Sequence, residues 1–266
     1  MGCSDSKSTN SVDNKPKTEN PQNNQGQSNA NHQQQNIKGS GEQEKVVELK
    51  FDGTCVLYAE VIPNDDADLG ELDRLCDEVA KFTREETGCL IYACGKIMHE
   101  KEPTRVAKYV FVGKFKTAEA AKAHQDNENN KPLIEAFTKL CVPGSLKGSM
   151  HMIVDNNENV RPWVQRDLNK ENPELYILIQ LKPKPEFKNK VLMGGPQIVG
   201  PTRLEEGCLN FDFMSVKGSD SISFFAVFTD KSAFDLHHET EHIKKAMPQM
   251  MEMLAESEFN ISARIC

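Results

Sequence analysis

The sequence predicts an α+β fold made of two copies of one unit, preceded by a polar N-terminal segment. First, the segment at 83–90 (TREETGCL) returns at 202–209 (TRLEEGCL). Second, alternating apolar runs and helix-like stretches follow each other in the same order in both copies. Third, the composition changes abruptly near residue 45. Because self-similarity at a fixed spacing usually defines an architecture, we expect the repeat to set the fold.

The similarity between the copies extends well beyond this segment. Upstream, 56–63 pairs with 176–183 at an offset of 120 residues; downstream, 109–115 pairs with 222–228 at an offset of 113. The offset shortens between the second and third matching segments, as expected for a hairpin loop that differs in length between the copies.

Each copy is predicted to have the order β-α-β-β-α-β, which is the ferredoxin-like arrangement. Glycine and proline at 194–196 predict a shortened or irregular first helix in copy two. The expected strands lie at 55–63, 89–97, 106–115 and 146–154 in copy one, and at 175–183, 208–216, 222–229 and 258–265 in copy two. The expected second helices lie at 117–140 and 230–256.

The chain divides into four expected segments, at 1–45, 46–156, 157–173 and 174–266. Asn and Gln supply 15 of the first 45 residues, and this segment has too few apolar side chains to fold, so we expect a disordered tail. Residues 157–173 form the linker between the two copies. A linker of this length lets the two sheets meet, so we expect an intramolecular pseudo-dimer. The sequence leaves any higher oligomer open.

The N-terminal residues match the M-G-x-x-x-[ST] pattern for myristoylation of Gly2. One acyl chain binds membranes weakly, and Cys3 is a candidate second site, for palmitoylation. The pattern predicts a lipid anchor on the cytoplasmic face of a eukaryotic membrane. A chance Met-Gly start is the alternative.

Charge and cysteine usage argue against two classes of protein, the general nucleic-acid-binding protein and the disulfide-stabilised protein. The net charge of −8 argues against a general nucleic-acid-binding protein with a basic face. The eight cysteines form no C-x-x-C pair, which favours reduced thiols over a disulfide framework.

The repeated residues resemble the antibiotic biosynthesis monooxygenase (ABM) family. The resemblance rests on Gly88-Cys89-Leu90-x-Tyr92 and on Phe115, Ala120 and His124, with matching residues in copy two. It implies a dimeric α+β barrel and a small aromatic or quinone-like ligand. It also implies a cofactor-independent monooxygenase. The alternative is a non-catalytic, lipid-anchored module for ligand binding or interaction.

Three side chains are catalytic candidates: Glu60, His124 and His237. An apolar strand would raise the pKa of Glu60 towards use as a general base; otherwise Glu60 is a polar residue at a frayed strand end. The histidines could exchange a proton with a phenol, or could serve only to bridge helix and sheet. The candidate substrate contacts are Tyr58, Tyr92, Asn210, Phe115 and Phe228.

No metal or other cofactor is expected. Residues 238–242 read H-E-x-x-H, but no histidine follows them, and copy one has Gln125 and Asn129 at the matching positions. Heme-degrading relatives are similar in fold but use a tryptophan where this chain has Phe115 and Phe228.

Overall fold

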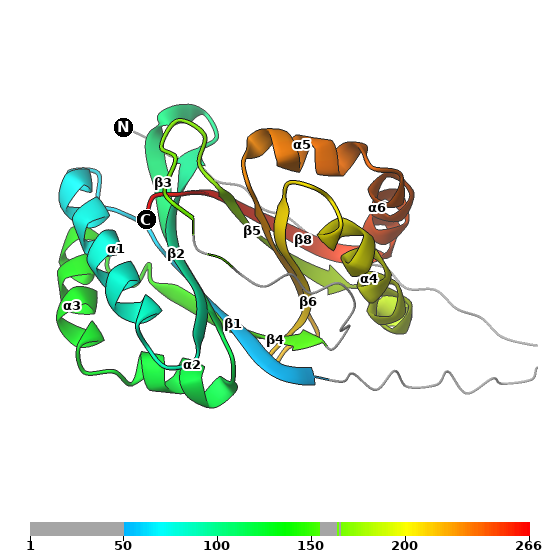
Figure 1. Cartoon of the computed structure of the whole chain (residues 1–266), viewed down its shortest axis with the longest axis horizontal. Helices are drawn as coiled ribbons and strands as arrows, with labels where there is room; N and C mark the ends of the chain where they lie inside the picture. The colour runs from blue at the N-terminus through cyan, green and yellow to red at the C-terminus, as the bar shows by residue number, and fades with distance from the viewer. Residues whose placement is uncertain (1–50, 155–163, 165) are drawn as a thin grey trace, which may run out of the picture. The chain divides into compact units, whose positions relative to one another are not determined.

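The computed structural model describes residues 51–154, residue 164 and residues 166–266. The predictions for the tail, for Gly2 and Cys3 and for most of the linker lie outside these residues. The described residues form eight strands, with helices between them, and the expected α+β fold is confirmed (Figure 1).

Repeat one comprises the first four strands and their helices. Its elements are β1 (Phe51–Val61), α1 (Leu69–Arg84), β2 (Cys89–His99), β3 (Glu102–Phe115), α2 (Ala118–Gln125), α3 (Asn130–Leu140) and β4 (Lys147–Val154).

Repeat two follows the same order, with one additional short 3-10 helix, η1. Its elements are β5 (Leu175–Pro183), η1 (Pro185–Phe187), α4 (Lys188–Arg203), β6 (Cys208–Val216), β7 (Ile222–Phe228), α5 (Lys231–Glu239), α6 (Glu241–Met253) and β8 (Leu254–Arg264). Within the described residues, no helix is both long and apolar enough to cross a bilayer.

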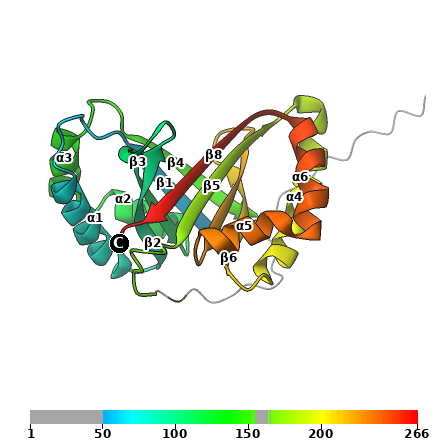
Figure 2. The same ribbon diagram turned by 90° about the horizontal axis from the view of Figure 1, so that it is seen from above.

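The strands close into one antiparallel barrel in the order β1-β3-β2-β8-β5-β7-β6-β4. The two repeats join at β2–β8, where Gly95 lies opposite Arg264, and at β4–β6, where His151 lies opposite Val216. Helices α1–α3 lie outside the barrel on one side and α4–α6 on the other (Figures 1 and 2). Each repeat therefore completes the sheet of the other.

Side chains alternate between the barrel interior and the layer under the helices. On β1, Val56 and Tyr58 belong to the apolar cluster inside the barrel, while Cys55 and Val61 pack in the layer between the sheet and the helices of repeat one. Repeat two has an equivalent layer of its own. The barrel interior and the two outer layers are thus three separate cores.

The prediction of one continuous second helix per copy is wrong. Residues 126–129 separate α2 from α3, and Asn130 Nδ2 donates to the carbonyl of His124 at 2.7 Å. Thr240 is extended, with ψ of 147°, and separates α5 from α6 while its hydroxyl donates to the carbonyl of His237. Asn and Thr side chains interrupt helices in this way because they compete for backbone hydrogen bonds.

The first helix of copy two was expected to be shortened or irregular. It is not shortened, because α4 runs for 16 residues with Pro196 and Pro201 inside it. Gly195 serves packing here: a Cβ at this position would lie 2.5 Å from the ring of Phe213, which is fully buried. In repeat one the matching positions hold Cys76 and Cys94, so the two repeats divide the same volume differently.

Candidate functional site

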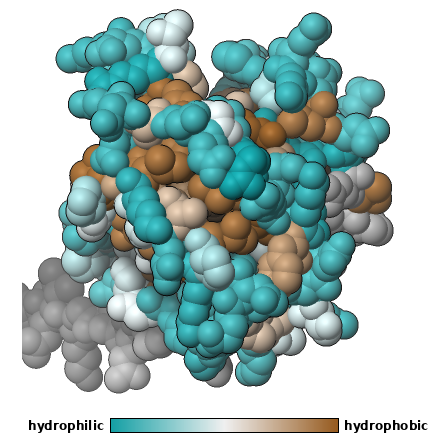
Figure 3. Space-filling view, turned by 90° about the vertical axis from the view of Figure 1, so that its left-hand side faces the viewer, coloured by the Kyte–Doolittle hydropathy of each residue, from teal (hydrophilic) through white to brown (hydrophobic). Residues whose placement is uncertain are grey.

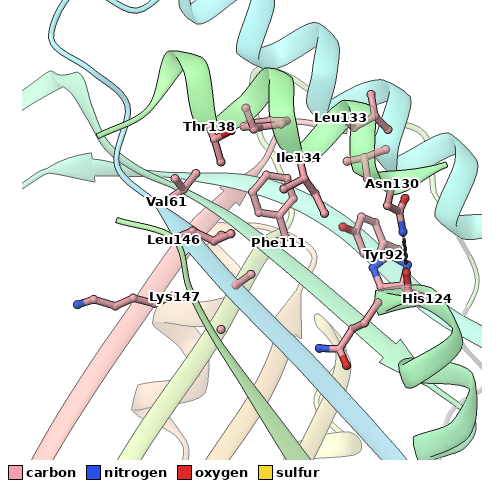
Figure 4. A pocket seen from close by; sticks show the side chains of 15 residues that line it. Val61, Tyr92, Phe111, His124, Asn130, Leu133, Ile134, Thr138, Leu146 and Lys147 are labelled. Carbon is pink, nitrogen blue, oxygen red and sulfur yellow. Dashed lines mark hydrogen bonds between the residues drawn. The ribbon is translucent and has the colours of Figure 1, made fainter. Parts of the chain in front are cut away.

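Repeat one contains a cavity of about 460 Å³ between the outer face of its sheet and α3 (Figure 4). A hollow of about 290 Å³ adjoins it and shares Tyr92, Phe111 and His124. Figure 3 shows apolar side chains gathered at the centre of the repeat-one face and framed by polar ones. Ile134 and Leu146, each about half exposed, line the cavity. Its walls are largely apolar and aromatic, as is usual for small-molecule sites.

His124, near the end of α2, is the central polar group of this cavity. Its ring centroid lies 5.4 Å from that of Tyr92 and 5.1 Å from that of Phe115. Tyr92 lines the cavity with it, whereas Phe115 is fully buried. Burial raises the pKa of Tyr92 far above its ordinary value, so its hydroxyl stays neutral.

Glu86 fixes the orientation of the His124 ring. His124 Nδ1 lies 2.8 Å from Glu86 Oε2, and Asn127 Nδ2 donates to Glu86 Oε1 at 2.9 Å. Within the described residues, Nε2 of His124 has no hydrogen-bond partner. The carboxylate therefore holds one ring nitrogen and leaves the other for a ligand.

Asn130, the first residue of α3, also lines the cavity and is 4% exposed. Its Nδ2 group donates a hydrogen bond to the carbonyl of His124, but its Oδ1 atom has no hydrogen-bond partner among the described residues. An unsatisfied buried acceptor costs about 1–3 kcal/mol, and a hydroxyl donor on a ligand would recover part of this. Sequence reasoning missed Asn130; its nearness to His124 in the chain, six residues away, was the available signal.

Glu60 lies away from this cavity. It shares the interior face of β1 with Tyr58, and its carboxylate accepts from Lys108 Nζ at 2.9 Å and from the Tyr58 hydroxyl at 3.2 Å. Burial and the neighbouring Glu60 raise the pKa of Tyr58. The structure thus places Glu60 apart from His124. Tyr58 is among the residues lining the adjoining hollow with His124, but its hydroxyl is bonded to Glu60.

Asn210 lies in a buried ionic cluster that joins the two repeats. Lys114 of repeat one donates to Asp212 Oδ2 at 2.6 Å and to Asn210 Oδ1 at 3.0 Å, and Arg203 donates to Asp212 Oδ1 at 2.8 Å. Burial raises the pKa of the Asp212 carboxyl, but Lys114 and Arg203 outweigh it and keep that pKa below its usual value. Asn210 therefore serves a contact between the repeats.

The matching space in repeat two is nearly filled. Among the described residues, the pocket between α6 and the sheet has a volume of about 40 Å³, and Met247 and Met250 line it together with His237. Phe228, matching Phe115, is fully buried with its ring centroid 5.1 Å from that of His237. Repeat one thus offers much more room for a ligand beside His124 than repeat two does beside the matching His237.

The H-E-x-x-H segment does not bring its two histidines to one point. The ring of His238 packs against Phe234, with centroids 4.6 Å apart. His242 instead approaches Glu205 and His237, and these three are the side chains within the described residues that come together as metal ligands do.

Comparison with known proteins agrees with this architecture. Residues 175–249 match the model of the family "Antibiotic biosynthesis monooxygenase", which confirms the family resemblance for repeat two. A curated relative, an uncharacterized protein of Synechocystis, is 24% identical over 96 residues. The matched residues are 36% of this chain and 65% of that protein, just under two thirds of its length.

Solved structures resemble both repeats together. A candidate monooxygenase from Fusobacterium nucleatum has a TM-score of 0.67 at 14% identity, covering 82% of this chain and 94% of that chain. A candidate monooxygenase from Lactobacillus acidophilus has a TM-score of 0.61 at 13% identity, covering 80% and 95%. An anthrone oxidase-like protein has a TM-score of 0.51 at 10% identity, covering 80% and 92%. The family match covers repeat two, and at these identities the solved structures show the fold alone.

Proposed function

We propose that the repeat-one cavity binds a small hydroxylated aromatic or quinone-like molecule and that the protein is a cofactor-independent monooxygenase acting on it. The supporting observation is the unpartnered Asn130 Oδ1 beside His124 in a cavity of about 460 Å³. Its volume falls within the range of about 300–1,000 Å³ typical of small-molecule sites.

The geometry assigns each polar group a role in this proposal. Asn130 Oδ1 accepts a hydrogen bond from a substrate hydroxyl, and His124 Nε2 takes a proton from the substrate. Glu86, 2.8 Å from Nδ1, stabilises the imidazolium that results. Deprotonation makes the aromatic ring electron-rich. In an anthrone-type substrate, the ring CH₂ group then reacts with O₂ to give C=O and water, so the substrate itself supplies the electrons.

Ligand binding and oxygen uptake test this proposal directly. The full chain is screened by native mass spectrometry against hydroquinones and anthrone-type tricyclic compounds, and oxygen uptake is followed with each compound that binds. We expect Asn130→Ile, which introduces the residue that repeat two has at Ile243, to weaken binding by 1–3 kcal/mol, or about 5- to 150-fold. We expect His124→Gln to abolish oxygen uptake while leaving most of the binding.

Glu60→Gln is the matched control, because repeat two has Gln180 at this position. It removes a carboxylate from the barrel interior and leaves the cavity intact, so we expect the affinity for the ligand to stay unchanged. Binding without oxygen uptake would favour the ligand-binding module, and no binding by any compound would contradict both functions.

Membrane tethering is a separate part of the proposal and rests on the motif at Gly2 and Cys3. A lipid anchor would keep the cavity close to lipophilic substrates. We expect Gly2→Ala to release the protein from membranes and Cys3→Ser to leave weak, reversible binding, because one acyl chain holds poorly. Cell fractionation measures the membrane binding of both variants. Gly2→Ala protein that stays in the membrane pellet would contradict the proposed lipid anchor.

A further inference from the structure

Repeat two brings an acidic side chain and two imidazoles to one point. Glu205 follows α4, His237 lies in α5, and His242 lies in the first turn of α6. His237 Nδ1 is 3.0 Å from both carboxylate oxygens of Glu205, and His242 Nε2 is 3.2 Å from Oε1. The three ligand atoms all lie within 4.8 Å of one another.

This donor set is that of a divalent transition metal. Two imidazole nitrogens and one carboxylate oxygen ligate zinc in sites that leave a fourth position to water. Tetrahedral bonds of about 2.0–2.1 Å place neighbouring ligand atoms roughly 3.3 Å apart. The Glu205 carboxylate lies 3.0 Å from His237 Nδ1 and 3.2 Å from His242 Nε2, close to this value.

We propose that Glu205, His237 and His242 form a binding site for a divalent transition metal ion such as Zn²⁺. The His237 side chain is 7% exposed, whereas that of His242 is 26% exposed, so an ion can enter from the side of His242. Binding replaces the contact at 3.1 Å between Thr202 Oγ1 and His242 Nε2. The ion then ties together α5, α6 and the end of α4.

Repeat one provides an internal comparison. It has the matching pair, Glu86 and His124, but an amide occupies the place of the second imidazole: Asn127 Nδ2 donates to Glu86 Oε1 at 2.9 Å. An amide nitrogen has no lone pair to offer a metal, so repeat one has two ligands where repeat two has three. The site therefore belongs to repeat two alone.

Metal titration of the full chain tests the proposal. Chelator-treated protein is titrated with Zn²⁺ by calorimetry and with Co²⁺ by visible absorption, which reports ligand geometry. We expect one equivalent to bind with a tetrahedral or five-coordinate Co²⁺ spectrum. His242→Asn and Glu205→Gln should each weaken binding by more than the roughly 100-fold that loss of an outer-shell partner gives.

Two control variants separate this site from its neighbours. His238→Ala alters the H-E-x-x-H segment outside the proposed ligand set, and Glu86→Gln alters the matching pair of repeat one. Both should keep one equivalent of metal. Circular-dichroism melting in chelator shows which variants fold. If His242→Asn does not fold, Glu205→Gln takes its place as the test variant. The proposal is wrong if wild-type protein binds no stoichiometric metal, or if His238→Ala loses as much affinity as His242→Asn.

Discussion

Repeat one and repeat two share a strand order but fill the layer between sheet and helices differently. Repeat one keeps a cavity of about 460 Å³ there, whereas repeat two keeps about 40 Å³. The helix that covers the layer has Asn130 and Ile134 in repeat one, where the matching positions in repeat two hold Ile243 and Met247. Methionine fills irregular gaps because its side chain is long and flexible.

This difference shows how a few side-chain volumes decide whether one fold holds a ligand site or a filled core. Apart from η1, the helices and strands follow the same order in both repeats, and both have a histidine held by a glutamate. The histidine–glutamate pair is therefore part of the shared framework. What surrounds it decides its use: an open cavity in repeat one and a second histidine in repeat two.

The largest expected effect comes from the ionic cluster that repeat one lacks. Asp212→Ala introduces the residue found at Ala93 and leaves Lys114 and Arg203 buried without their carboxylate. We expect the free energy of unfolding to fall by about 3–5 kcal/mol, measured by urea denaturation.

Adding Lys114→Val, which introduces the residue found at Val227, should restore part of this loss because it removes the buried ammonium group that Asp212→Ala leaves without its carboxylate. A double variant as unstable as the sum of its two single variants would show that Lys114 and Asp212 do not interact.

The next effect concerns Gly195 and Phe213, which together fill the volume that Cys76 and Cys94 fill in repeat one. Phe213→Cys introduces the residue found at Cys94 and leaves a void, so we expect a loss of about 3 kcal/mol. Gly195→Cys introduces the residue found at Cys76 and places a Cβ 2.5 Å from the Phe213 ring, costing about 1–3 kcal/mol.

The double variant reproduces the repeat-one pair and should be more stable than the sum of both losses predicts. Urea denaturation of all four proteins gives the coupling free energy. If the losses in the free energy of unfolding are strictly additive, then the residues at positions 195 and 213 do not compensate each other's volume.

The smallest effect is a pH dependence of the free energy of unfolding, contributed by a histidine of repeat one. His151 is fully buried between the hydroxyls of Ser149 and Ser223, and burial lowers its pKa to about 4. Repeat two has Ser262 at the matching strand position, which does not titrate in this range.

Because the folded pKa lies below the unfolded value of about 6.5, the unfolded state binds the proton first as the pH falls. The free energy by which neutral, buried His151 stabilises the fold is fully present above pH 6.5 and is lost progressively as the pH falls from 6.5 to 4. We expect about 1.5 kcal/mol of it to be lost between pH 6.5 and 5. His151→Asn should flatten this decline, and His99→Gln should leave it unchanged; an equal decline in His151→Asn would exclude His151 as the cause.

The sequence predicted the order of the elements because that order depends on local patterns. Segments such as 83–90 and 202–209 repeat at nearly constant spacing, and alternating or helical periodicity identifies each element without any long-range contact. The breaks at 126–129 and at Thr240 were missed, since they depend on single side chains that capture a backbone carbonyl.

The site was predicted only in part, for a geometrical reason. Alternation along β1 places Tyr58 and Glu60 on one face, but it does not say whether that face lines the barrel or lies under the helices. His124 and Tyr92 were identified through the resemblance of their segments to a known family. Asn130 and Glu205 are ordinary polar residues in sequence, and only their positions beside a histidine give them a role.

The sequence by itself determined that this chain repeats one βαββαβ unit, because the repeat and the periodicity are written in neighbouring residues. The repeat and the family resemblance also predicted that the two sheets pair in one barrel, which the closed strand order confirms. The tertiary structure alone decided that one outer layer stays open while the other is filled. It also decided that Glu205 meets His242. These features depend on the volumes and charges of side chains far apart in the chain, and only packing brings such side chains together.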